Sequence, residues 1–168
     1  QQGLQKSTFC KLLVPNELQA YYTDSFDLAS PAAAEQKLAL FGLIYLDEFD
    51  KISEKKMPLL KNLLQMSRLN IRKSHQSNFS SLPRVASFIG TSNQKELLTD
   101  PTGSRRFLCI EVNEEIDSSS INHAQLYAQL KTLLEQGERY WMNKEEEAAW
   151  KKVNQSFYRI SAEEDVFN

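Results

Sequence analysis

Residues 43–48 read Leu-Ile-Tyr-Leu-Asp-Glu, an unbroken apolar run that ends in two acids. A run of this kind is typical of a strand that is buried on both faces of a parallel sheet. Asp47 and Glu48 need water, a metal ion or a positive partner, so the buried strand has to end where they begin. The alternative is that both acids only mark a solvated strand end and cap the next helix.

Predicted helices and strands alternate on either side of this run. The spacing and composition predict helices at residues 6–13, 32–41 and 53–69, and again from residue 122 onward, where Trp141 and Trp150 are expected anchors. Ser30 is the expected N-cap of the second helix, with Pro31 in its first turn. Strands are predicted at residues 21–26, 40–46, 85–90 and 106–112. The alternation predicts an α/β fold with a layered, mostly parallel sheet.

Length, net charge and cysteine count exclude several classes of protein. The chain has 168 residues, of which 41% are hydrophobic, enough for one domain with a substantial core. A net charge of −2 excludes a uniformly basic protein that coats DNA, so any nucleic-acid contact has to come from a local patch. Cys10 and Cys109 are too few for a disulfide framework or a zinc ribbon, and each is expected to be a buried thiol.

The ends of the chain and its apolar runs lead to two expectations. No apolar run approaches the ~20 residues of a membrane-spanning helix and no leader opens the chain, so we expect a cytoplasmic protein with no membrane contact. The chain begins with Gln1 inside a motif. We therefore expect a fragment that is truncated at its N-terminus and lacks its first strand.

The opening residues Gly3-Leu4-Gln5-Lys6-Ser7-Thr8 resemble the end of a P-loop, in which backbone N–H groups hold phosphates. In that alignment Lys6 meets the β and γ phosphates of ATP, Ser7 ligates Mg²⁺, and Gly3 and Thr8 belong to the same ATP-binding segment. Gln5 stands where the pattern has its second glycine. The alternative is an ordinary helix start, because a lysine followed by Ser and Thr opens many helices.

Three further positions complete a candidate ATPase site. Asp47 would hold Mg²⁺ and Glu48 would polarise the attacking water. Asn93 follows an apolar strand, where an amide can orient water without adding negative charge, although a turn-forming asparagine is the alternative. Arg105 and Arg106 are adjacent, so one can point toward the phosphates of a neighbouring subunit while the other pairs internally, and the sequence leaves open which.

The order of these motifs resembles the virulence-associated protein E family, which is similar to superfamily-3 helicases and AAA+ ATPases. The motifs are Gly-Leu-Gln-Lys-Ser-Thr-Phe at residues 3–9, Leu-Asp-Glu-Phe-Asp at 46–50, Pro-Arg at 83–84, Gly-Thr-Ser-Asn at 90–93 and Asp-Pro-Thr-Gly-Ser-Arg-Arg-Phe at 100–107. The match extends to about residue 112, and residues 135–157 are similar to the helical tail of that family.

This resemblance implies a P-loop NTPase three-layer sandwich with a mostly parallel sheet. Residues 1–116 would form the ATPase core and residues 117–168 a helical tail that packs on it. The implied activity is that of an Mg²⁺-dependent ATPase that drives a DNA helicase or translocase of a phage or mobile element. Members of the family are often joined to a primase-like region. We expect this activity to be impaired in a truncated chain.

The resemblance also implies how DNA is bound. In such motors a hairpin between the acid-ended strand and the sensor strand grips single-stranded DNA or a DNA fork. Residues 70–83 occupy that place here, and Arg72, Lys73 and His75 are its candidate phosphate contacts. A solvated loop is the alternative for this insert. A homo-oligomeric ring is expected, because the arginine has to come from a neighbouring subunit.

Two other functions remain open. Gln5 favours a degenerate P-loop module that binds nucleic acid or protein partners without turnover, because a side chain there can obstruct the close backbone approach that glycine permits. A metal-dependent nuclease could use Asp47, Glu48 and Asp50. The nuclease is less favoured because no further acid or histidine motif completes a two-metal site.

Overall fold

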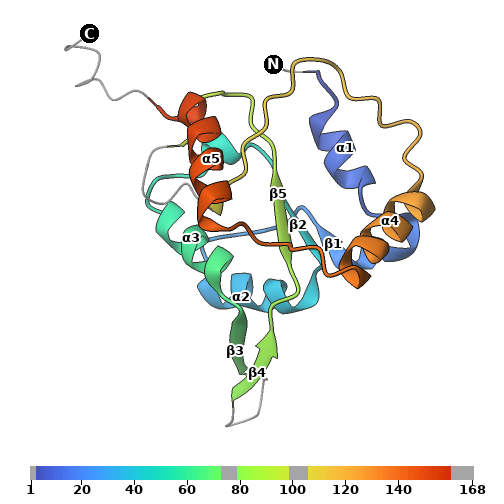
Figure 1. Cartoon of the computed structure of the whole chain (residues 1–168). Helices are drawn as coiled ribbons and strands as arrows, with labels where there is room; N and C mark the ends of the chain where they lie inside the picture. Colours follow the sequence, from blue (N-terminus) through green and yellow to red (C-terminus); the bar gives the residue numbers. More distant parts are fainter. Residues whose placement is uncertain (1–2, 73–78, 99–105, 160–168) are drawn as a thin grey trace, which may run out of the picture. The chain divides into compact units, whose positions relative to one another are not determined.

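The computed structural model describes residues 3–72, 79–98 and 106–159, and these form two compact units (Figure 1). Lys6–Thr91 form the first, which we call the sheet unit. The described residues of Gln1–Gln5 and Ser92–Asn168 form the second, which we call the C-terminal unit. The functional division expected after residue 116 stays a prediction.

The sheet unit is built on three parallel strands in the order β1-β2-β5. The strands are β1 (Tyr22–Thr23), β2 (Leu43–Leu46) and β5 (Ser87–Gly90). The buried parallel strand predicted from the apolar run at residues 43–48 is confirmed: β2 is the middle strand, and Ile44 in β2 is completely buried. The chain is therefore α/β with a small parallel sheet. β1 is shorter than the predicted strand, because the preceding residues Asn16–Tyr21 form the 3-10 helix η1.

Three helices accompany the sheet: α1 (Lys6–Leu12), α2 (Pro31–Leu40) and α3 (Met57–Gln65). The predicted start of α2 is confirmed, since the Ser30 hydroxyl accepts a hydrogen bond from the Ala33 N–H at 3.4 Å and Pro31 opens the helix. Leu38 in α2 is completely buried, and its carbonyl accepts from the N–H groups of Val85 and Ala86. The end of α2 therefore fixes the chain just before β5. Because α2 runs through Leu40, β2 begins later than the strand predicted at residues 40–46.

The helix predicted at residues 53–69 is wrong at both ends. α3 spans only Met57–Gln65, with Leu60 and Leu63 completely buried. The chain then forms β3 (Arg68–Arg72), which pairs antiparallel with β4 (Phe79–Pro83). Leu69 keeps a helix-like spacing from α3, but it is buried in a strand whose register places it opposite Leu82. The hairpin expected at residues 70–83 is thus confirmed by its two paired strands. Residues 73–78, between these strands, lie outside the described part of the chain.

The C-terminal unit contains α4 (His123–Glu135), α5 (Lys144–Asn154) and the 3-10 helix η4 (Gln155–Phe157). The helical prediction from residue 122 onward is confirmed for α4 and α5. Among the described residues, no helix is long and apolar enough to cross a bilayer. Phe157 is buried, and its carbonyl accepts from the N–H groups of Leu97 and Leu98.

The strand predicted at residues 106–112 is wrong, because residues 107–112 carry no regular secondary structure. Backbone groups of this segment form hydrogen bonds with side chains of α5 instead. The Phe107 carbonyl accepts from Trp150 Nε1 at 3.2 Å and from Asn154 Nδ2 at 2.8 Å, and the Cys109 N–H donates to Asn154 Oδ1 at 3.3 Å. Trp150 is therefore an anchor, as expected. Trp141 is 59% exposed, so the same expectation is wrong for Trp141.

The close approach of β5 to β2 depends on Gly90. A Cβ at this residue would lie 3.1 Å from the Leu46 carbonyl oxygen, which also accepts from the Thr91 N–H. We predict that Gly90→Ala lowers the free energy of unfolding by about 1–2 kcal/mol, because the two strands have to move apart. Urea denaturation followed by circular dichroism measures the change.

Gly42→Ala is the matched control for Gly90→Ala. A Cβ at Gly42 would meet its nearest atom, the Tyr21 carbonyl oxygen, at an ordinary distance of 3.8 Å. We expect a change within about 0.5 kcal/mol for this variant. Equal destabilisation by the two substitutions would contradict the role given to Gly90.

Candidate functional site

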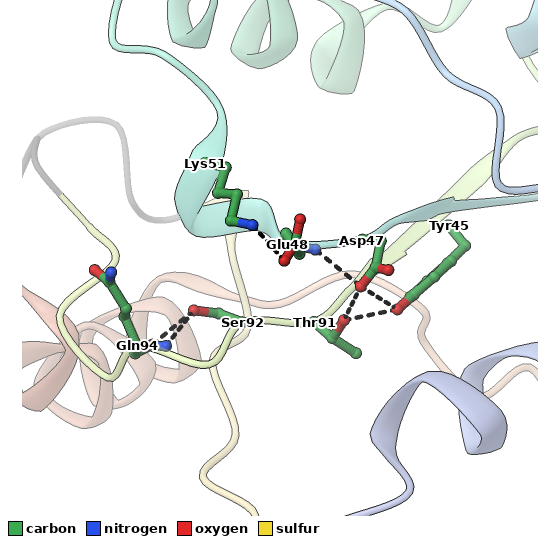
Figure 2. A network of polar contacts seen from close by, with 7 residues as sticks. All are labelled: Tyr45, Asp47, Glu48, Lys51, Thr91, Ser92 and Gln94. Atoms are coloured by element: carbon green, nitrogen blue, oxygen red, sulfur yellow. Dashed lines mark hydrogen bonds and ion pairs between the residues drawn. The ribbon is translucent and has the colours of Figure 1, made fainter. Parts of the chain in front are cut away.

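The chain turns sharply at the carboxyl end of β2, where the two acids stand (Figure 2). Glu48 has a left-handed backbone with φ of 47°, and the 3-10 helix η2 (Phe49–Lys51) begins directly after it. This turn returns Phe49 to the core, where its N–H donates to the Thr91 carbonyl at 2.8 Å. A left-handed residue other than glycine costs about 1–2 kcal/mol, and such conformations concentrate at functional sites.

Asp47 accepts three hydrogen bonds on a single oxygen, as Figure 2 shows. The Tyr45 hydroxyl donates to Asp47 Oδ1 at 2.8 Å, the Thr91 hydroxyl at 3.1 Å and the Glu48 N–H at 2.9 Å. The two hydroxyls also lie 2.7 Å from each other. Strand geometry explains the cluster: Tyr45 is in register with Ile89, so Asp47 and Thr91, two residues further along each strand, share its face of the sheet.

These contacts keep Asp47 ionised. The hydrogen bond from Tyr45 lowers the pKa of the Asp47 carboxyl, and the bonds from Thr91 and the Glu48 N–H lower it further against the opposing effect of partial burial. Burial in turn raises the pKa of Tyr45, so its phenol remains a protonated donor. Because the pKa of Asp47 lies below its ordinary value, the carboxylate keeps its charge down to a lower pH than a solvated aspartate does.

α1 carries Ser7 near the same cluster. Burial raises the pKa of Tyr45, and the nearby Ser7 hydroxyl lowers it against that larger effect. Cys10, three residues further along α1, is buried, and burial together with the nearby charge of Asp47 raises its pKa to about 11. Of the predicted metal ligands, Asp47 is bonded to Tyr45, and Ser7 is near enough to act on the pKa of the same tyrosine.

The other candidates in the sheet unit are less tightly placed. Lys6 is the first residue of α1 and is half-buried, and Thr8 is exposed on the same helix. Glu48 forms an ion pair with Lys51, which was not among the predicted site residues, and both side chains are partly exposed. The hydrogen bond with Glu48 raises the pKa of Lys51. Exposed ion pairs are weak, so the Glu48 carboxylate is easily released.

The remaining candidate site residues lie in the C-terminal unit or outside the described residues. Gly3, Asn93 and Arg106 belong to the C-terminal unit, and Arg105 falls outside the described part of the chain. Asn93 is exposed between Ser92 and Gln94, where the Ser92 hydroxyl accepts from the Gln94 N–H at 3.0 Å in a local turn (Figure 2). This is the turn context that the sequence analysis kept as the alternative for Asn93, and the sensor role stays a prediction.

The predicted DNA contacts are only partly covered by the structure. Arg72 ends β3, whereas Lys73 and His75 lie outside the described residues. Near the other end of the hairpin, Arg68 Nε donates to the Ser81 hydroxyl at 2.9 Å. The DNA-binding role of this hairpin therefore stays a prediction.

Sequence reasoning missed two members of the cluster, Tyr45 and Thr91. Tyr45 belongs to the apolar run and was not predicted as a site residue. It precedes Asp47 by two residues, so both side chains lie on one face of the strand. Thr91 stands directly after β5 in the Gly-Thr-Ser-Asn motif, from which only Asn93 was selected. Thr91 is a polar side chain in the core, with 8% exposure. A buried hydroxyl needs hydrogen-bond partners, and the sequence alone does not predict which residues they are.

Gln5 has the backbone conformation of the glycine that the P-loop pattern places there. Its φ is 58°, in the left-handed region, and Gly3 also has a positive φ of 85°. We predict that Gln5→Gly raises the free energy of unfolding by up to about 1 kcal/mol, because glycine adopts this conformation without steric conflict. Thermal unfolding followed by fluorescence detects the change.

Gln129→Gly is the matched control, since Gln129 lies in the interior of α4 and is exposed. The same substitution in a helix should lower the free energy of unfolding by roughly 1 kcal/mol. Destabilisation by both variants would show that the Gln5 side chain makes contacts that outweigh the relief of its backbone.

Comparison with known proteins identifies the family. The sequence matches the family model of the virulence-associated protein E-like domain over residues 1–159. A search of curated proteins finds no match to the chain. Because the family match covers all but the last residues, the chain belongs to the family of virulence-associated protein E-like domains.

Proposed function

We propose that the chain is the ATP-hydrolysing core of an Mg²⁺-dependent DNA helicase or translocase of a phage or mobile element. The observation that carries this proposal is the Asp47 carboxylate at the carboxyl end of β2, where Tyr45, Thr91 and the Glu48 N–H all donate to one of its oxygens. Burial raises the pKa of Tyr45, and the Ser7 hydroxyl of the P-loop-like motif lies near enough to lower it in part, which supports Ser7 and Asp47 as ligands of a single Mg²⁺.

The chemistry of the cluster fits Mg²⁺ and a triphosphate. Mg²⁺ prefers oxygen ligands, few of them from protein, and keeps most of the others from water and phosphate. Ser7 supplies a hydroxyl oxygen and Asp47 a carboxylate that stays charged at neutral pH. When bound, the metal would offset the negative charge of the β and γ phosphates. Lys6, which precedes Ser7, would add a second positive charge to those phosphates.

The arrangement of the sheet also supports a P-loop sandwich. In open parallel sheets, ligands bind beyond the carboxyl ends of the strands. Here β2 and β5 run parallel, and Asp47 and Thr91 directly follow their carboxyl ends. A nucleotide at this edge would lie next to α1, which carries Ser7.

Glu48 is the proposed water-activating group. In the structure its carboxylate is paired with Lys51, and an exposed pair of this kind is readily released. In the proposed ATPase cycle, Asn93 is the sensor. Arg105 or Arg106 is supplied to the nucleotide of a neighbouring subunit, and the subunits assemble as a ring. The β3–β4 hairpin would contact single-stranded DNA through Arg72, Lys73 and His75, and a primase region could be linked to this core.

A degenerate P-loop module is the second candidate. Gln5 in place of glycine favours it, since the side chain stands where backbone should approach phosphate. Such a module would bind nucleotide, nucleic acid or protein partners without turnover. A two-metal nuclease has less support, because the described residues contain no group of three His, Cys, Asp or Glu side chains that could hold a metal.

ATP hydrolysis with and without single-stranded DNA tests the proposal. We expect Glu48→Gln to lower turnover at least about 100-fold while nucleotide still binds, because the variant loses the general base. Lys6→Ala should weaken nucleotide binding itself. A coupled assay for phosphate release and a fluorescent ATP analogue measure the two effects in the protein that carries this chain.

Two exposed residues of the sheet unit provide controls for the ATPase assay. Glu54→Gln and Lys55→Ala remove the same charges at positions away from the cluster and should leave turnover at the wild-type rate. Hydrolysis by Glu48→Gln at the wild-type rate would reject the proposed base. Nucleotide binding by the wild-type protein without any turnover would favour the degenerate module.

A further inference from the structure

We propose that Tyr45 is a positioning residue for a divalent cation: its hydroxyl fixes the Asp47 carboxylate so that Oδ1 is taken up by protein donors and Oδ2 is presented to the metal. This inference rests on the proposed function for the identity of the ligand, Mg²⁺ with a nucleoside triphosphate. It adds a residue that neither the motif nor the sequence resemblance selects.

The two oxygens of the Asp47 carboxylate accept different numbers of hydrogen bonds. Oδ1 accepts from Tyr45, Thr91 and the Glu48 N–H. Among the described residues no hydrogen bond reaches Oδ2, and the Asp47 residue as a whole is exposed. The carboxylate is therefore oriented by one oxygen and open at the other. One open oxygen on a fixed carboxylate suits Mg²⁺, which requires near-ideal octahedral geometry.

The Tyr45 ring is held in place by burial. Tyr45 is 5% exposed and lies in the central strand of the sheet. A buried ring in a packed strand has little rotational freedom, so its hydroxyl has a defined position. That hydroxyl contacts Asp47 at the end of β2 and Thr91 after β5. Tyr45 therefore determines how these two side chains are spaced.

The hydroxyl protons are limited in number. A tyrosine hydroxyl has one proton, and here it is donated to Asp47 Oδ1. The Thr91 hydroxyl also has one proton, and it has two close acceptors, Asp47 Oδ1 at 3.1 Å and the Tyr45 oxygen at 2.7 Å. The Tyr45 proton therefore fixes the Asp47 carboxylate whichever acceptor Thr91 uses.

Tyr45→Phe removes only the hydroxyl and tests the proposal. We expect the Mg²⁺ concentration at half-saturation of nucleotide binding to rise about 10-fold, as for the loss of other groups that orient a metal ligand. Affinity for the nucleotide at saturating Mg²⁺ should be unchanged. The probe is a fluorescent ATP analogue titrated with Mg²⁺ in the protein that carries this chain.

Tyr22→Phe is the matched control, because Tyr22 lies on the same face of the neighbouring strand β1. Among the described residues its hydroxyl donates no hydrogen bond to Asp47. This variant should keep the wild-type Mg²⁺ dependence. If Tyr45→Phe fails to fold, Thr91→Val removes the second hydroxyl from Asp47 and should shift the Mg²⁺ dependence in the same direction, while Thr91→Ser should restore it.

A ¹³C NMR titration of the Asp47 carboxyl, without nucleotide or metal, supplies an independent readout. Loss of the Tyr45 hydrogen bond should raise the pKa of Asp47 toward its ordinary value. An unchanged pKa and an unchanged Mg²⁺ dependence in Tyr45→Phe would overturn the proposal, as would an equal loss of nucleotide affinity at every Mg²⁺ concentration. If the wild-type protein binds no Mg²⁺ with nucleotide, the proposed function fails. Broadening of the Asp47 amide signal by Mn²⁺ alone then decides the proposal: it should weaken in Tyr45→Phe, and equal broadening in the two proteins would overturn it.

Discussion

The hydrogen bonds that two hydroxyls donate to the Asp47 carboxylate are the interaction on which the candidate site depends. One hydroxyl comes from Tyr45 on the same strand and the other from Thr91, after the neighbouring strand. Their meeting requires the parallel pairing of β2 with β5, and the absence of a side chain at Gly90 permits that close approach. The left-handed turn at Glu48 follows directly and anchors the chain again at Phe49.

The use of neutral hydroxyls in place of cations has an electrostatic consequence. A lysine or arginine beside Asp47 would also lower its pKa, but it would cancel the charge that a metal ion needs. Tyr45 and Thr91 stabilise the ionised form without neutralising it. The nearest described ion pair uses the other acid, since Lys51 bonds to Glu48. The two adjacent acids thus have different environments, as expected if one binds metal and the other handles a proton.

Sequence reasoning predicted the elements whose signals are local. The apolar run of β2, the Ser30 cap of α2 and the hairpin after α3 all follow from short patterns. The errors arose where tertiary contacts decide: Leu69 has helical spacing but pairs in a strand, and residues 107–112 have strand-like composition but bond to side chains of α5. In the site, Ser7 and Asp47 were selected from motifs. Tyr45 and Thr91 were missed because their contact depends on strand register across 46 residues of chain.

Paramagnetic broadening by Mn²⁺ bound with ATP measures which residues surround the metal. We expect amide signals of Ser7, Asp47 and Thr91 in a ¹⁵N-labelled protein to lose intensity first. The signal of Ser81 in the β3–β4 hairpin should persist at the same Mn²⁺ concentration. Broadening centred on other residues, or equal loss at Ser81 and Asp47, would contradict a metal and nucleotide site at the carboxyl end of β2.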